Sequence, residues 1–148
     1  MQQRFLTWVA AIFASLLMTG APAQAQTPSD VLIVGQIAEP KSLDPAAVTA
    51  VNDFRILVNI YDGLVRYKSG TLQVEPALAK SWEISDDGTV YTFDLRQDVT
   101  FHDGTSFEAS DVVFSLDRAR AEDSVNAQKQ LFEPIESVTA VDPHTVRI

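Results

Sequence analysis

The strongest constraint on the fold is a hairpin pattern in the middle of the chain. Apolar and polar residues alternate from Tyr91 to Arg96, which predicts a strand with one buried face and one wet face. The preceding Ser85–Gly88 stretch, Ser-Asp-Asp-Gly, is a strong turn signal. Ser81–Ile84 supplies the partner strand. Because a tight turn joins them, the two strands must run antiparallel.

The other segments predict a mixed α/β fold around this hairpin. A β-branched apolar run at Val31–Ile37 predicts a buried strand. One helix is predicted to begin at Asn52, as its cap, and to end at Gly63. A second helix is predicted from about Ala109 to Ala121. Further strands are predicted at 64–67, 135–141 and 145–148, and a helical turn at 77–80.

The N-terminal segment has the pattern of an export signal. Arg4 is the only charged residue before Asp30, and an apolar run extends from Phe5 to Met18. Small residues follow, with an A-x-A site that ends at Ala25. The run is shorter than the about 20 residues that a spanning helix needs. We therefore expect residues 1–25 to be a signal peptide that is cleaved after Ala25.

The composition restricts the partners and the compartment. The chain has no cysteine and a formal net charge of −9. Without cysteine there is neither a disulfide nor a lipid attachment site, so we expect a free periplasmic protein with no direct membrane anchor. The acidic balance disfavours nucleic acid and anionic lipid as partners because like charges repel. We expect no nucleic-acid partner.

Motifs for common hydrolytic and metal chemistry are missing from the sequence. It contains no G-x-S-x-G, no H-E-x-x-H and no cysteine nucleophile, although a catalytic pair of carboxylates stays open. His102 and His144 are far apart and make a weak metal pattern. Asp86-Asp87-Gly88 lacks the spaced acidic ligands of a calcium loop. The chain is therefore expected to have no metal, no cofactor and no enzymatic activity.

Several motifs follow one another in a characteristic order. They are EPKSLDP (Glu39–Pro45), IYDGLVRY (Ile60–Tyr67), PALAKSWEISDDGTVYTFDLR (Pro76–Arg96), VTFHDGTSFEASDVVFSLDR (Val99–Arg118) and VDPHTVRI (Val141–Ile148). This order resembles the family 5 extracellular solute-binding proteins, which include dipeptide, oligopeptide and nickel binding proteins. The resemblance covers essentially all of Val31–Ile148.

The resemblance implies an α/β, type II-like periplasmic binding fold with two lobes that enclose the ligand. Members of the family are several-fold longer than this chain. Residues 26–148 are therefore expected to be the N-terminal part of a truncated solute-binding domain and to supply only part of the first lobe. The resemblance further implies that the lobes close around the ligand and that the closed form docks on an inner-membrane ABC permease.

The resemblance favours a di- or oligopeptide as the solute of a monomeric periplasmic protein. Nickel chelate, oligosaccharide, opine and glutathione stay open as other solutes. An exported hydrolase is the distant alternative from another functional class.

The best candidate for contact with the ligand is the loop and helix start between Val48 and Phe54. Loops at strand ends carry ligand contacts in α/β proteins, and a helix N-terminus offers free N–H groups to a carboxylate. The alternative is an ordinary helix cap at Asn52. The candidate ligand-binding residues are Val51, Asn52, Asp53, Phe54 and Glu39.

Two further sets of side chains have competing interpretations. Glu39 and Asp44 can pair with a ligand amine or a nearby base, or can be solvated in their Pro-rich loop. The aromatic residues of the hairpin region can stack on a ligand, but their alternation favours the core of the sheet. These aromatic residues are Trp82, Tyr91, Phe93 and Phe101.

Overall fold

The structure is a computed structural model that describes residues 27–148. The predicted signal peptide, residues 1–25, lies outside the described residues. Contacts divide the chain into two units, Met1–Gly35 and Gln36–Ile148. In the described part of the first unit, the Val31 N–H donates to the Pro28 carbonyl at 3.0 Å and closes a turn. None of the helices within 27–148 is long and apolar enough to cross a membrane.

The predicted strand at Val31–Ile37 is wrong for this structure. The segment has no strand assignment, and its side chains are exposed, with Leu32 at 87% and Ile37 at 91%. A strand exists through hydrogen bonds to a neighbouring strand. No strand within residues 27–148 pairs with this segment, so its apolar pattern alone does not make it a strand.

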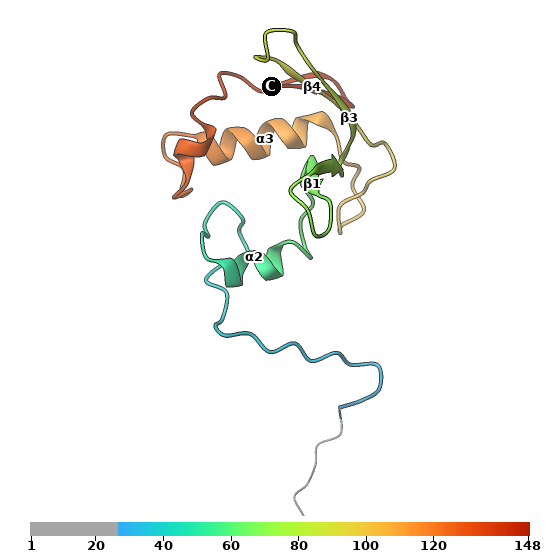
Figure 1. The fold of residues 1–148 in the computed structure, drawn as a ribbon, viewed down its shortest axis with the longest axis vertical. Coiled ribbons are helices and arrows are strands. Elements are labelled where there is room, and N and C mark those ends of the chain that lie inside the picture. The colour runs from blue at the N-terminus through green and yellow to red at the C-terminus, as the bar shows by residue number, and fades with distance from the viewer. Residues whose placement is uncertain (1–26) are drawn as a thin grey trace, which may run out of the picture. The chain divides into compact units, whose positions relative to one another are not determined.

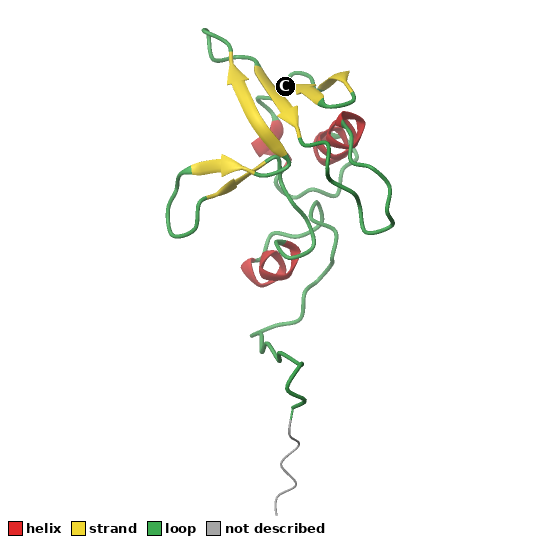
Figure 2. Cartoon of the chain, turned by 90° about the vertical axis from the view of Figure 1, so that its right-hand side faces the viewer, coloured by secondary structure: helices red, strands yellow, loops and turns green. Residues whose placement is uncertain are grey.

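An antiparallel sheet forms the centre of the larger unit (Figure 2). Its order is β3-β4-β6-β5, with bounds Ala79–Ile84, Tyr91–Leu95, Thr145–Arg147 and Thr139–Asp142 respectively. The β3–β4 pair is the hairpin that the sequence predicts, and Trp82 lies opposite Phe93 in its register. Gly88 has a φ of +74° in the connecting turn, a conformation that favours glycine. The predicted hairpin is therefore confirmed.

A smaller ribbon leads into this sheet. Strand β1 (Val65–Tyr67) pairs antiparallel with β2 (Val74–Pro76), and Figure 2 shows the ribbon apart from the larger sheet. The predicted helical turn at 77–80 is wrong because β3 already begins at Ala79. The Ala79 N–H donates to the Leu64 carbonyl at 2.9 Å, and Ala79 is fully buried. Tertiary pairing thus outweighs the helical propensity of Ala-Leu-Ala.

Helix α3, Ala109–Arg120, packs along the sheet and contacts β5 and β6 (Figure 1). Its first turn is fixed twice. The Ala109 N–H donates to the Pro143 carbonyl at 2.8 Å, and the Asp111 carboxylate accepts the Glu108 N–H at 2.8 Å, as in a capping box. A short 3₁₀ helix, η1 (Lys129–Phe132), follows.

The core lies between α3 and the sheet. It is made of side chains that are almost completely buried: Ala79, Leu95, Phe107, Ala109, Val112, Val138 and Val146. The core combines residues from the hairpin, from α3, from β6 and from the segments just before α3 and β5. The fold is therefore the mixed α/β arrangement that the sequence pattern predicts.

Helix α2, Val51–Leu57, is shorter than predicted. Its N-cap is Ala50, which provides no side-chain cap, and its C-cap is Val58. Asn52 is therefore inside the helix rather than at its cap, and Gly63 lies well beyond its end. The side chain of Asn52 is engaged instead by the preceding loop, which removes it from the capping role that its residue type favours.

Replacing Leu95 tests the core. Leu95→Ala removes a side chain with no exposed surface, and we expect the free energy of unfolding to fall by about 2–5 kcal/mol because a cavity is left. Leu72→Ala is the control, since Leu72 is 89% exposed and its loss is expected to change stability by less than about 0.5 kcal/mol. Urea unfolding curves of the three proteins measure both effects, and equal curves would contradict this core.

Candidate functional site

The structure brings together some of the predicted ligand-binding residues. Glu39, Asn52 and Asp53 are linked by hydrogen bonds, in which the Asn52 amide donates to the Glu39 carbonyl at 3.4 Å and to Asp53 Oδ1 at 3.1 Å. Glu39 has an exposed side chain. Val51 and Phe54 are exposed at 69% and 37%. The side chains of Glu39 in the loop and of Val51 and Phe54 at the start of α2 are therefore all accessible to solvent.

Asp53 differs from the other candidates because it is completely buried. Its Oδ1 accepts the Lys41 backbone N–H at 3.1 Å, while its Oδ2 is buried without a hydrogen-bond partner among the described residues. It lies in the first turn of α2, where a negative charge is favourable. Its carboxylate thus faces the loop and has no surface to offer a solute in this structure.

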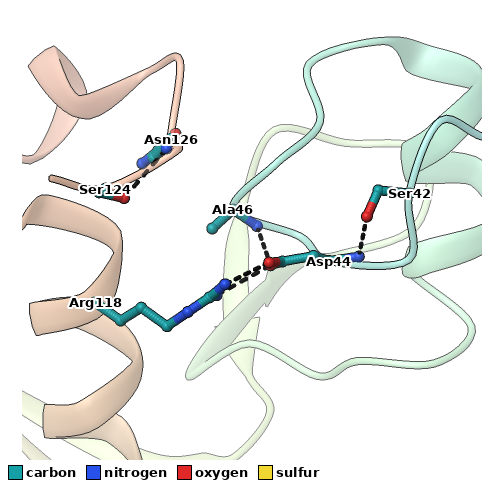
Figure 3. Close-up of polar contacts among 6 residues, drawn as sticks. All are labelled: Ser42, Asp44, Ala46, Arg118, Ser124 and Asn126. Carbon is teal, nitrogen blue, oxygen red and sulfur yellow. Dashed lines mark hydrogen bonds and ion pairs between the residues drawn. The ribbon is translucent and has the colours of Figure 1, made fainter.

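The loop before α2 is also tied to α3, through Asp44 and Arg118 (Figure 3). Arg118 Nη1 donates to Asp44 Oδ1 at 3.0 Å, and Nη2 donates to Oδ2. Asp44 Oδ1 also accepts the Ala46 N–H at 3.0 Å, and the Asp44 N–H donates to Ser42 Oγ at 3.0 Å. Among the interpretations of Asp44, pairing with a nearby base is therefore the one that the structure supports.

Arg118 is a residue that sequence reasoning missed. It lies 74 positions after Asp44, and no spacing rule connects two residues so far apart. The sequence shows only that α3 ends in basic residues, which suits the negative end of a helix.

The ion pair changes the titration of both partners. The hydrogen bonds from Arg118, then that from the Ala46 N–H, hold the pKa of Asp44 below its ordinary value of 3.8. The same contact raises the pKa of Arg118. Since the side chains are 45% exposed at Arg118 and 30% exposed at Asp44, solvent screens the pair and its contribution to stability is modest.

A separate cavity of about 420 Å³ lies beside α3. Ile60–Leu64, Val99–His102 and one side of α3 line it, and most of this lining is apolar. Its polar groups include Asp62, His102 and Asp111, with no lysine or arginine in the lining. None of the predicted ligand-binding residues lines it. Its volume is in the range of small-molecule pockets, and its walls come from segments that are far apart in the sequence.

The aromatic residues do not form a single stacking platform. Trp82 and Tyr91 each lie against Phe93, with ring centroids 6.4 Å apart in both pairs. Phe101 packs instead against Phe107, at 6.2 Å and at a steep angle. Phe93 packs against the core, while Tyr91 is 39% exposed. The prediction of a sheet-core role is confirmed for Phe93.

The two histidines lie in different turns. His102 belongs to the turn before α3, and His144 lies between β5 and β6, where its backbone N–H donates to Asp142 Oδ1 at 2.7 Å. Within residues 27–148 no group of three His, Cys, Asp or Glu side chains is placed to hold a metal ion. The Asp87 carboxylate is bound by Ser85 and Thr89, so this acidic stretch is a hairpin turn as predicted.

Comparison with known proteins gives a consistent result. The family model described as "Bacterial extracellular solute-binding proteins, family 5 Middle" matches residues 73–148. The probable D,D-dipeptide-binding periplasmic protein DdpA of Escherichia coli (strain K12) is 35% identical over 150 residues, which cover 98% of this chain and 29% of that protein.

Two solved structures have the same fold over most of the chain. The periplasmic binding protein DppA from Helicobacter pylori, in complex with the peptide STSA, is 39% identical with a TM-score of 0.67, covering 74% of this chain and 25% of that one. MoaA from A. tumefaciens R10, in complex with mannopinic acid, is 42% identical with a TM-score of 0.67, covering 72% and 22%. This likeness confirms the fold class, and the chain spans less than a third of the length of these relatives.

The Asp44–Arg118 ion pair predicts that the free energy of unfolding depends on pH, and that Asp44→Asn removes this contribution. Because the pKa of Asp44 is lowered on folding, the pair stabilises the protein above the unfolded-state pKa. That contribution is lost as the pH falls through the lowered folded-state pKa. We expect the wild type to be more stable than the variant by at most about 1 kcal/mol above about pH 5, and the difference to shrink below about pH 4.

Urea unfolding at a series of pH values measures this difference. Arg118→Gln serves as the matched variant, because it removes the same pair from the other side and is expected to give the same pH profile. A stability difference that stays unchanged down to pH 2 would contradict the assignment.

Proposed function

The chain belongs to the bacterial extracellular solute-binding proteins of family 5, and we propose from this that the complete protein is the periplasmic solute-binding component of an ABC importer. The match of the family model to residues 73–148 is the observation that carries the proposal. The fold shared with binding proteins that hold a peptide or mannopinic acid supports it.

Di- or oligopeptides are the solute class that we propose. Both the Escherichia coli relative and the Helicobacter pylori structure are named for binding dipeptides or a peptide. The exposed carboxylate of Glu39 can pair with the amino group of a peptide. The exposed side chains of Val51 and Phe54 offer apolar contact to a peptide side chain. An opine is the second candidate, because the relative from A. tumefaciens holds mannopinic acid.

Binding is proposed to proceed by closure of two lobes, with no chemical step on the solute. The relatives are more than three times as long as the part that this chain matches. We therefore propose that residues 26–148 form part of one wall of the binding site and that a second lobe completes it. An inner-membrane permease is the proposed receiver of the solute. Turnover of a peptide by the complete protein would instead favour the exported hydrolase.

Ligand stabilisation tests the proposed solute class. We expect the complete protein to be stabilised by a peptide pool, by about 2.7 kcal/mol at a concentration 100 times the dissociation constant. Thermal melting with dipeptides, N-acetylated dipeptides and mannopinic acid distinguishes the candidates. Stabilisation by mannopinic acid alone would favour the opine, and no stabilisation by any solute would overturn the proposal.

Glu39→Gln is the variant for this experiment. If Glu39 pairs with the peptide amine, the affinity of the variant for free dipeptides is about tenfold or more below that of the wild type. The affinity of the variant for N-acetylated dipeptides is expected to equal that of the wild type. Glu83→Gln, another exposed glutamate on β3, is the matched control and is expected to bind like the wild type.

We propose that residues 1–25 direct export and that this signal peptide is then cleaved after Ala25. We expect the protein in a periplasmic extract to begin at Gln26, because small residues at Ala23 and Ala25 fit the cleavage site. Intact mass spectrometry measures the N-terminus directly. Ala25→Arg is expected to block cleavage and leave the longer protein in the membrane fraction, while a mature protein that retains residues 1–25 would contradict the proposal.

A further inference from the structure

Two side chains from different helices hold the loop that precedes α2. Asp53 of α2 accepts the Lys41 N–H at 3.1 Å, and Arg118 of α3 binds the Asp44 carboxylate through both of its terminal nitrogens. The two contacts lie only three residues apart along the loop. Figure 3 shows the second contact, with Arg118 extending from α3 to the loop.

The first anchor uses a completely buried charged group. Asp53 has no exposed surface, and one of its oxygens has no hydrogen-bond partner among residues 27–148. A buried carboxylate that is only partly hydrogen-bonded costs free energy. Its visible contribution is to fix the backbone at Lys41 and to orient the Asn52 amide, which in turn reaches the Glu39 carbonyl.

The second anchor fixes the other end of the loop. Arg118 binds Asp44 with two parallel hydrogen bonds, a geometry that restricts orientation as well as distance. The same Asp44 closes the following turn, because its side chain accepts the Ala46 N–H and its carbonyl accepts the Ala47 N–H, both at 3.0 Å. A shift of Asp44 would therefore move the whole turn.

We propose that Asp53 and Arg118 are positioning residues that hold residues 39–46 as one rigid body, and that solute affinity depends on this rigidity. The proposal rests on the proposed function, since Glu39 lies at one end of this loop. A binding loop that is already ordered loses less conformational entropy when a solute binds, so its affinity is higher. Neither Asp53 nor Arg118 needs to touch the solute for this effect.

Backbone hydrogen exchange of the complete protein tests the rigid loop. In Arg118→Gln, we expect exchange at the Lys41 amide to become roughly two- to fivefold faster, as loss of a partly exposed ion pair predicts. Arg118 makes no hydrogen bond to Lys41, so a response there means that the loop moves as one unit. The Leu95 amide, which donates to the His144 carbonyl in the sheet, reports global opening and is expected to stay unchanged.

Arg96→Gln is the matched control. Arg96 binds Asp98 through two nitrogens, and its side chain is 45% exposed, as is that of Arg118. The Arg96–Asp98 pair joins two residues that are close in sequence, and it lies outside the loop formed by residues 39–46. We expect this variant to leave exchange at Lys41 at the wild-type rate.

Asp53→Asn and Asp53→Ala separate the first anchor from general stability. Asparagine retains an acceptor for the Lys41 N–H, so we expect a small change in exchange at Lys41. Alanine removes the acceptor, and we expect the exchange rate there to rise by about tenfold or more. If the alanine variant fails to fold, the asparagine and Arg118→Gln variants still decide the proposal.

Solute affinity supplies the second readout. We expect the dipeptide dissociation constant to rise about two- to fivefold in Arg118→Gln, and not in Arg96→Gln. Equal exchange at Lys41 in both variants and the wild type would overturn the rigid loop. Faster exchange with unchanged affinity would overturn the link to binding. If the wild type binds no solute, the proposed function fails, and the exchange measurements alone decide the positioning roles.

Discussion

Pairing of β4 on both of its edges is the interaction on which the rest of the structure depends. Its register with β3 places Phe93 opposite Trp82, and its register with β6 places the same residue opposite Val146. The backbone groups of a central strand are thus satisfied on both sides. This pairing directs Leu95 and Val146, both fully buried, toward α3, and the core forms there.

The sheet in turn sets the position of the loop before α2. Because the Ala109 N–H binds the Pro143 carbonyl, the first turn of α3 is attached to the connection between β5 and β6. Arg118, near the other end of that helix, then reaches Asp44. Strand pairing therefore positions α3, and α3 in turn positions the loop before α2, where we place the solute.

At the candidate site, the type of a residue does not by itself determine whether its side chain is exposed or buried. Glu39, Val51 and Phe54 present exposed groups at the start of α2, as their location in a loop and helix start predicts. Asp53 has the residue type of a ligand-binding group, but it is buried against the Lys41 backbone. The direction of an acidic side chain in a first helical turn depends on which hydrogen-bond donors of the preceding loop lie close to it. The sequence does not show which donors these are.

The sequence by itself determined the β3–β4 hairpin, α3 and the existence of the terminal pair of strands, because turn residues and hydrophobic periodicity act over a few neighbouring positions. The first of these two strands begins at Thr139, later than the predicted start at residue 135. Family membership also followed from the order of motifs along the chain. Tertiary structure decided that Ala79 begins a strand, that Val31–Ile37 is not one, and that Arg118 meets Asp44. These outcomes depend on contacts between distant residues, whose free energies outweigh local propensity and leave no signature in spacing.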